Sequence, residues 1–212
     1  MKLIDYSVLD FVKEVDSAKP APGGGSASAI ASALGMALSR MVGHLTIPKK
    51  KFKALDDYIQ DDFIEIHERL KDGQRRAMEL VDEDTLAFNE IMKAFKMPKE
   101  TEEAKRKRKA AIEKATYKAT EVPLEIARLS YETLSKLSHT AAYANKNAIS
   151  DVGVSALLLH SALEGAILNV NINLPGIQDE KYKQKIYNEV NTMLKEGNQF
   201  KTNVLNTVND KI

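Results

Sequence analysis

The sequence has no cysteine and no tryptophan, and its 212 residues include only four histidines. Without cysteine there is no disulfide framework, no thiolate metal site and no cysteine nucleophile, and the scattered histidines do not have the spacing of a zinc motif. Charge of one sign is also lacking, because 31 basic residues nearly balance 30 acidic ones and leave a net charge of +1. So small a net charge provides no overall electrostatic attraction for a polyanion, and we therefore expect no nucleic acid and no membrane as partners. The lack of cysteine and of a histidine motif leads us to expect no metal.

Targeting and membrane-spanning signals are missing too. Residues 1–17 carry acidic side chains and no long apolar stretch, unlike a secretory signal peptide. In the most apolar segment of the chain, the uncharged run lasts only from Val152 to Leu163, well short of the ~18 residues that cross a bilayer. We therefore expect a cytoplasmic protein in which this segment is a core helix.

What the sequence does have is apolar residues at helical spacing. Hydrophobic residues make up 43% of the chain, which is enough for a sizeable core and too much for a disordered tail. Runs of alternating β-branched residues bounded by turn pairs are absent, so the pattern predicts an all-α fold. The length suits one domain, taken as residues 1–212.

Interruptions of the apolar pattern divide the chain into about six long helices. Gly73 is expected to break or bend one of them, and the missing N–H of Pro123 predicts a kink or a split in another. Short connections favour an antiparallel bundle, and wide apolar faces in so small a chain favour a homodimer. The expected helices cover residues 5–16, about 26–45, 49–96, 101–143, 151–173 and 179–211.

The sharpest local feature is the segment Pro20-Ala-Pro-Gly-Gly-Gly-Ser26, which leads into a helix rich in small residues. Its glycines permit close approach of a ligand to the backbone, and a helix start offers unpaired N–H groups with a partial positive charge. An anion or a ring carbonyl fits such a place, and a plain tight turn capped by Ser26 fits the pattern equally well. The segment lacks the spacing of a Walker loop or a dinucleotide-binding loop, which disfavours ATP and NAD.

One carboxylate falls on a face where a charge is unexpected. At 100° per residue, Asp84 lies on the line of Val81 and Phe88, whereas Asp82 lies about 160° away from that line. A carboxylate on an apolar face is paired, hydrogen-bonded or held with a raised pKa, and the last of these suits a general acid or base. The alternative for Asp84 is a structural ion pair with a neighbouring helix.

A stripe of small and polar residues follows the apolar helix, and it either admits a neighbouring helix or lines a cavity. Asp151 stands at the helix start, where capping is the commoner role. The amides of Asn169 and Asn173 suit a heterocycle edge as well as an interhelical bond. Because Asp151 and Asn169 are ~27 Å apart on one helix, they cannot both touch one reacting carbon. The stripe consists of Asp151, Ser155, Leu158, Ala162, Gly165, Asn169 and Asn173.

Basic residues form one run, Lys105 to Lys109, preceded by Glu100, Glu102 and Glu103. Such a run is usually a solvated helix face with pairs at i,i+4. The alternative is a landing patch for a ligand tail that carries several carboxylates. Both interpretations remain open at this point.

Six motifs follow one another along the chain. They are Pro-Ala-Pro-Gly-Gly-Gly-Ser at 20–26, Asp-Glu-Asp-Thr-Leu-Ala-Phe at 82–88, Met-Pro-Lys at 97–99 followed by Arg108, Glu-Val-Pro-Leu at 121–124, Ser-Asp at 150–151, and Asn-Val-Asn-Ile-Asn-Leu at 169–174. In this order they resemble the motifs of the cyclodeaminase/cyclohydrolase family, which includes the C-terminal domain of formiminotransferase-cyclodeaminase and stand-alone bacterial methenyltetrahydrofolate cyclohydrolases. The resemblance runs from about residue 10 to the end, and it implies an all-helical, dimeric fold that acts on folate-bound one-carbon units.

The resemblance also implies roles for single residues. It makes Asp84 the leading catalytic candidate, while Asp82 in the same motif keeps the choice open. Arg108 matches an arginine of the family and is expected to face the glutamate tail. The residues expected beside the folate or in its pocket are Gly23, Gly24, Gly25, Ser26, Asp151 and Asn169, with the amide of Asn173 a further candidate.

The function implied is cyclisation of 5-formimidoyltetrahydrofolate to 5,10-methenyltetrahydrofolate with release of ammonia. Hydrolysis of 5,10-methenyltetrahydrofolate to the 10-formyl form is the alternative, and a non-catalytic helical binding module is a more distant one. The expected partners are a reduced folate, with or without a polyglutamate tail, and a second copy of the chain. No cofactor is expected beyond the tetrahydrofolate substrate.

Overall fold

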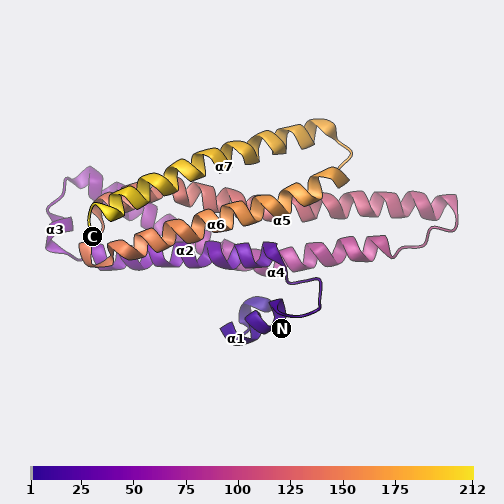
Figure 1. The fold of residues 1–212 in the computed structure, drawn as a ribbon, viewed down its shortest axis with the longest axis horizontal. Coiled ribbons are helices and arrows are strands. Elements are labelled where there is room, and N and C mark those ends of the chain that lie inside the picture. Colours follow the sequence, from indigo (N-terminus) through magenta and orange to yellow (C-terminus); the bar gives the residue numbers. More distant parts are fainter. Residues whose placement is uncertain (1) are drawn as a thin grey trace.

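The computed structural model describes residues 2–212, and these residues form helices and contain no strand (Figure 1). The prediction of an all-α fold is confirmed. In chain order the elements are the short 3-10 helix η1 (Leu3–Asp5), α1 (Val8–Val15), α2 (Gly24–Thr46), α3 (Lys50–Lys53), α4 (Asp57–Phe95), α5 (Glu102–Tyr143), η2 (Lys146–Ala148), α6 (Ile149–Asn173), η3 (Leu174–Gly176) and α7 (Glu180–Asn209).

The five long helices lie along one common axis and form an antiparallel bundle (Figure 1). Helix α6 packs against α2, α5 and α7, and α2 packs against α4 on its other side. Helices α4 and α5 extend beyond the other helices at one end, where they form a hairpin. Leu80, Leu124 and Leu163 are fully buried in this core, and burial of each such side chain is worth about 1.5–3 kcal/mol.

Small residues let α2 and α6 approach closely, as the stripes on both helices predict. A Cβ atom on Gly35 would lie 2.7 Å from Leu159 Cγ, and one on Gly165 would lie 2.5 Å from Ser28 Oγ. The Ser155 hydroxyl donates to the backbone carbonyl of Gly35 at 2.6 Å. The stripe on α6 therefore admits a neighbouring helix, and α2 packs between α6 and α4.

Two helix boundaries differ from the prediction because of local capping. The segment expected as one helix over 5–16 is divided, since Ser7 caps α1 by accepting a hydrogen bond from the Asp10 amide at 3.1 Å. The helix expected over 49–96 is also divided, because Asp56 takes an extended conformation before α4 begins at Asp57. Only the single turn of α3 precedes that break.

Gly73 and Pro123 do not divide their helices. Helix α4 continues through Gly73, where a Cβ atom would lie 3.2 Å from Met36 Sδ, so the glycine lets α2 come close. Helix α5 continues through Pro123, whose missing N–H leaves the carbonyl of Ala119 without its helical donor. The side-chain amide of Asn173 donates to that carbonyl at 2.7 Å. A bond from α6 thus replaces the one that proline removes.

Helix α6 is the one helix of the described residues that is long and apolar enough to cross a membrane by length and composition alone. In the bundle α2, α5 and α7 pack against it and twelve of its residues are buried, whereas Leu157, Leu168 and Ile172 lie on an exposed face. The helix is part of the core, as the sequence predicts, but it is not buried on every side.

Candidate active site

The glycine segment forms the start of α2, two residues earlier than predicted. Gly23 is the N-cap residue and has no side chain with which to cap the first-turn amides of α2. Ser26 is therefore inside the first turn and does not cap it. Its hydroxyl is fully buried and reaches across to α4, where it donates to the carbonyl of Val81 at 2.8 Å.

The carboxylate of Asp84 lies directly against this helix start. A Cβ atom on Gly25 would lie 2.0 Å from Asp84 Oδ1, so the carboxylate occupies the place that a side chain at position 25 would need. Asp84 Oδ2 is 3.2 Å from the Ser26 hydroxyl oxygen. Glycine at position 25 is thus a condition for the carboxylate to sit at the N-terminus of α2.

Burial raises the pKa of Asp84 above its ordinary value. Hydrogen bonds from the hydroxyl and the backbone amide of Ser26 lower the pKa, but their effect is smaller than that of burial. No basic side chain forms an ion pair with Asp84 in the described part of the chain. The carboxyl is therefore hydrogen-bonded and half-buried, with a pKa moved toward the range in which one group both takes and gives a proton.

The neighbouring carboxylate, Asp82, has a different task. Its Oδ1 accepts a hydrogen bond from the Leu3 amide at 2.6 Å, and its Oδ2 accepts one from the Ile4 amide at 3.4 Å. Asp82 thereby fastens the N-terminal segment to α4. Of the two aspartates that the sequence leaves as candidates, Asp84 is the one beside the glycine segment.

The three other polar residues predicted on α6 lie at different places. Asn169 is beside the glycine segment, since a Cβ atom on Gly24 would lie 3.0 Å from its Nδ2 atom. Asn173, one turn further, donates to the Ala119 carbonyl as described above. Asp151 is in the first turn of α6, ~27 Å from Asn169 along the helix. Within one chain, the structure brings together Asp84, Asn169 and the glycine segment, and leaves Asp151 at the other end of α6.

Arg108 lies near the tip of the α4–α5 hairpin. Its guanidinium donates to the Phe95 carbonyl at 3.2 Å and lies 6.0 Å from the centre of the Phe95 ring. Lys99, Lys105 and Lys109 line a cavity of about 170 Å³ together with Arg108. In the same basic run, Lys105 pairs with Glu102 and Lys107 with Glu103 on the exposed face of α5. The ion pairs confirm the exposed helix face for Lys105 and Lys107, and a landing patch for a carboxylated tail at Arg108 stays a prediction.

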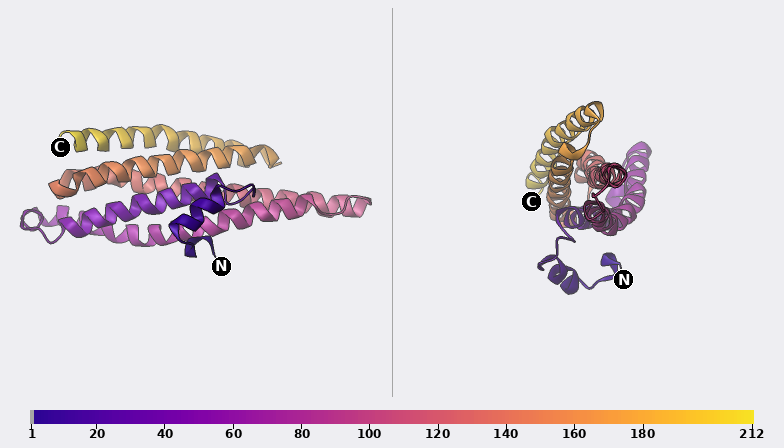
Figure 2. Two further views of the ribbon diagram at one scale, coloured as in Figure 1. Left: turned by 60° about the horizontal axis from the view of Figure 1, so that its bottom comes forward. Right: turned by 90° about the vertical axis from the view of Figure 1, so that its right-hand side faces the viewer.

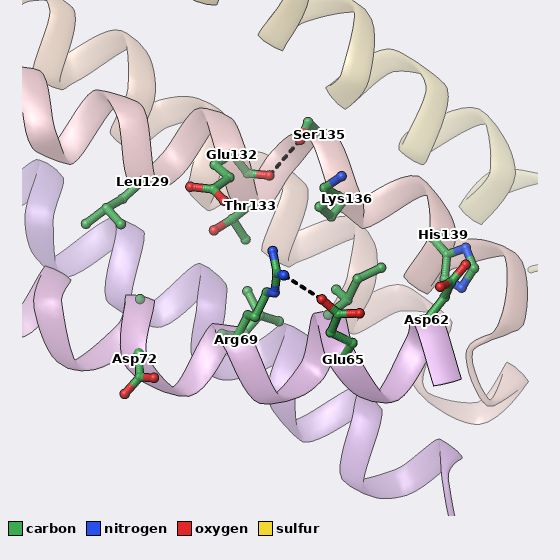
Figure 3. Close-up of a pocket in the computed structure, with 13 residues that line it drawn as sticks. Asp62, Glu65, Arg69, Asp72, Leu129, Glu132, Thr133, Ser135, Lys136 and His139 are labelled. Atoms are coloured by element: carbon green, nitrogen blue, oxygen red, sulfur yellow. Dashed lines mark hydrogen bonds and ion pairs between the residues drawn. The ribbon is translucent and has the colours of Figure 1, made fainter. Parts of the chain in front are cut away.

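A larger cavity of about 610 Å³ lies between α4 and α5, away from the glycine segment (Figure 3). Acidic and basic side chains from both helices surround it, and Arg69 is paired with Glu65 at 2.5 Å across one turn of α4. None of the residues predicted for the site lines this cavity. Volume alone therefore does not locate the site.

Sequence reasoning did not single out Thr85, beside Asp84, or Phe95, further along the same helix. Thr85 has its hydroxyl 3.1 Å from that of Ser26, and no sequence signal marks such a contact between helices. Phe95 lies on the same face of α4 as Asp84, about 20° away around the helix. The 100° periodicity that singled out Asp84 would also have found Phe95.

A bundle that holds a half-buried carboxylate against a glycine-lined helix start offers the kind of group that acid–base catalysis uses. The sequence matches the family described as Formiminotransferase-cyclodeaminase over residues 7–192. The chain belongs to this family, whose members act in folate one-carbon metabolism, and the resemblance seen in its motifs is confirmed.

Similar proteins include both stand-alone chains and parts of longer ones. Methenyltetrahydrofolate cyclohydrolase of Methylorubrum extorquens is 34% identical over 206 residues, which are 97% of each chain. Formimidoyltransferase-cyclodeaminase of Mus musculus is 34% identical over 92% of this chain, which spans 35% of that protein. The crystal structure of formiminotetrahydrofolate cyclodeaminase from Thermotoga maritima superposes with a TM-score of 0.85 at 26% identity, covering 97% of both chains. Like these relatives, the chain is an enzyme.

Proposed function

We propose that this enzyme cyclises 5-formimidoyltetrahydrofolate to 5,10-methenyltetrahydrofolate with release of ammonia, and that Asp84 is its catalytic residue. The observation that carries the proposal is the half-buried Asp84 carboxylate, pressed against Gly25 and bonded by Ser26 at the start of α2. Such a group stands where backbone amides can orient a ligand, and its raised pKa suits transfer of protons in both directions.

One carboxylate is sufficient for the proton transfers of this reaction. N10 of the substrate attacks the carbon of the formimidoyl group, which is carried as its amidinium, and the new C–N bond leaves N10 positively charged. Asp84 takes the proton from N10 and gives it to the amino group on the same carbon. The C–N bond to that nitrogen then breaks, ammonia leaves, and the positive charge stays on the methenyl bridge. Asp84 ends in its starting state.

The face of α4 that carries Asp84 also supports a binding path for the rest of the folate. Asp84 and Phe95 are ~17 Å apart along this face, with Phe88 between them. Phe95 is 50% exposed because the hairpin extends past α2 and α6, and Arg108 lies over it. A folate has an aromatic ring between its pteridine and its glutamate, and this ring suits such a path. The carboxylates of the glutamate tail suit Arg108 and Lys99. Gly24, Asn169 and Asn173 are proposed to bind the pteridine end.

Hydrolysis of 5,10-methenyltetrahydrofolate to 10-formyltetrahydrofolate is the second candidate. The end-to-end similarity to the Methylorubrum extorquens protein favours it. The same carboxylate would take a proton from water as its oxygen attacks the bridge carbon and return that proton to N5 as the C–N5 bond breaks. The remaining hydroxyl proton is lost to solvent, which balances the charge of the methenyl cation.

We further propose that two copies pair through the outer faces of α2 and α6 and through α1. These faces expose Leu34 on α2 and Leu157 on α6, each about half exposed. Helix α1 lies outside the bundle (Figure 2) and buries none of its own residues, although Val8 and Leu9 are apolar. A second copy is the simplest cover for these surfaces. Asp151 is far from the site of its own chain, so it can contact a folate site only if that site belongs to the second copy of the dimer.

The reaction is proposed to take place in the cytoplasm. It is proposed to use no cofactor beyond the tetrahydrofolate substrate, because proton transfers alone complete it. The test is to incubate the pure protein with each folate and follow methenyl absorbance. Appearance of that absorbance from 5-formimidoyltetrahydrofolate, with ammonia in equal amount, supports the cyclodeaminase. Loss of methenyl absorbance well above the spontaneous rate, with no reaction of the formimidoyl substrate, overturns it in favour of the cyclohydrolase.

A further inference from the structure

The hydroxyl of Ser26 has three polar neighbours, and two of them compete for its single proton when Asp84 is ionised. Its oxygen is 2.8 Å from the Val81 carbonyl, 3.2 Å from Asp84 Oδ2 and 3.1 Å from the Thr85 hydroxyl. Ser26 has no exposed surface, so water does not compete for these contacts. A serine hydroxyl carries a single proton and two lone pairs, so it donates to only one of these neighbours at any time.

When Asp84 is ionised, its carboxylate is the stronger acceptor. The Ser26 hydroxyl then donates to Asp84 Oδ2, because a charge-assisted hydrogen bond is roughly twice as strong as a neutral one. Thr85 donates in turn to the Ser26 oxygen. The Val81 carbonyl then loses the serine bond but is not left unsatisfied, since it is within α4 and keeps its helical N–H partner.

When Asp84 is protonated, the same atoms pair in the opposite sense. The carboxyl O–H donates to the Ser26 oxygen, and the Ser26 hydroxyl turns to the Val81 carbonyl at 2.8 Å. Only hydroxyl protons move between the two arrangements, and each heavy atom keeps its place. A buried site that changes protonation state twice in a cycle gains from such a low reorganisation.

We propose that Ser26 is a positioning residue for Asp84, whose hydroxyl turns between the Asp84 carboxylate and the Val81 carbonyl as the carboxyl loses and gains its proton. This inference rests on the proposed function of Asp84. The side chain of Ser26 acts on the Asp84 carboxylate. This role is distinct from the contact with the folate that the first turn of α2 is proposed to make. Thr85 completes the chain of hydroxyls.

The test is the pH dependence of kcat/KM in Ser26→Ala. Alanine removes a donor to the carboxylate and an acceptor for the carboxyl, and the first loss is larger because that bond is charge-assisted. The pKa of Asp84 therefore rises, and the acid limb of the profile moves up by about 0.5–1 pH unit. An acid limb that stays in place or moves down overturns the inference, because a merely structural serine would lower activity without moving the limb.

Matched variants separate this inference from its premise. Ser32→Ala removes an equally buried hydroxyl of α2 that bonds Ser130 and touches no carboxylate, so its acid limb should not move. Thr85→Val should move the limb in the same direction by less, and it decides the matter if Ser26→Ala does not fold. Asp84→Asn with full activity would refute the proposed function, whereas an inactive Asp84→Asn with an unmoved limb in the other variants refutes the role of Ser26 alone.

Discussion

At each end of α2 a glycine packs against a titratable side chain, but the two side chains differ in their hydrogen bonds. At its start a Cβ atom on Gly25 would lie 2.0 Å from Asp84 Oδ1, and near its end one on Gly43 would lie 2.0 Å from His67 Nδ1. Both side chains come from α4. Asp84 has hydrogen bonds from Ser26, whereas neither imidazole nitrogen of His67 has a partner within residues 2–212.

The difference favours Asp84 over His67 as a group for proton transfer. Burial raises the pKa of Asp84 and lowers that of His67, so both groups are moved toward their neutral forms. His44 and Arg40 lower the pKa of His67 further, which keeps a proton away from it. Only at the Gly25 end do hydrogen bonds also support the charged form. A buried group needs support for both forms to act as base and acid in one cycle.

The largest expected effect comes from Gly25→Ala compared with Gly43→Ala. The new methyl group at position 25 must displace the Asp84 carboxylate, so kcat should fall about 100-fold, as a misplacement of ~1 Å commonly causes. The same change at position 43 displaces His67, and it should lower the thermal midpoint while leaving kcat within about twofold. Steady-state assays and thermal unfolding of both variants measure this. Equal losses of kcat in the two would remove the distinction between the ends.

A second expectation concerns the path that leads from the Gly25 end toward the hairpin. Arg108→Ala removes a guanidinium, whose bonds to carboxylates are worth ~1.5–3 kcal/mol. KM for a triglutamylated substrate should rise about tenfold or more with little change in kcat, and KM for the monoglutamate should rise less. Lys107→Ala is the matched control, because Lys107 pairs with Glu103 on the exposed face of α5. A similar rise of KM in both variants would contradict a specific role for Arg108.

The smallest effects are on stability, and their dependence on pH has opposite sign at the two ends. Because the folded-state pKa of Asp84 is raised, wild type loses stability as the pH rises from the ordinary pKa of the carboxyl, 3.8, through the raised one. Asp84→Asn should therefore be more stable than wild type at pH 7, and the gain should vanish toward pH 4. Thermal unfolding of wild type and variant at several pH values measures the difference, and a difference that does not change with pH would count against a raised pKa.

His67 provides the opposite case. Because its folded-state pKa is lowered, wild type loses stability as the pH falls from the ordinary value of 6.5 through the lowered one. His67→Leu should lose less stability than wild type between about pH 7 and pH 5. The same thermal unfolding series checks this, and His44→Leu should also lose slightly less stability than wild type, because His44 is one of the groups that lower the pKa of His67. If both variants follow wild type, burial of His67 has no effect on its titration.

The sequence predicts the helices and one side of the site because both depend on local periodicity. The phase of Asp84 on α4 follows from 100° per residue, and the close approach of α2 follows from its small residues. The continuity of α5 through Pro123 could not be predicted locally, because the bond that compensates for proline comes from Asn173 on another helix. The break before α4 depends on a cap conformation at Asp56 that periodicity does not reveal.

The parts of the site that the sequence did not provide depend on the register between helices. Ser26 and Asp84 are 58 positions apart, and only the crossing of α2 and α4 places their oxygens 3.2 Å from each other. The motif leaves Asp82 as a rival of Asp84, because it contains both aspartates. The contacts of Asp82 with the Leu3 and Ile4 amides come from a segment whose path the motif does not describe.

The most direct test of the central claim is the rate of methenyl formation in a single turnover by Asp84→Asn, measured beside Asp82→Asn. Asparagine keeps the size of the side chain and the acceptor for Ser26 but cannot carry the proton. The account predicts a loss of about 10²–10⁴-fold for Asp84→Asn and a rate within a few-fold of wild type for Asp82→Asn, whose bonds fasten the N-terminal segment. A full rate in folded Asp84→Asn would contradict it.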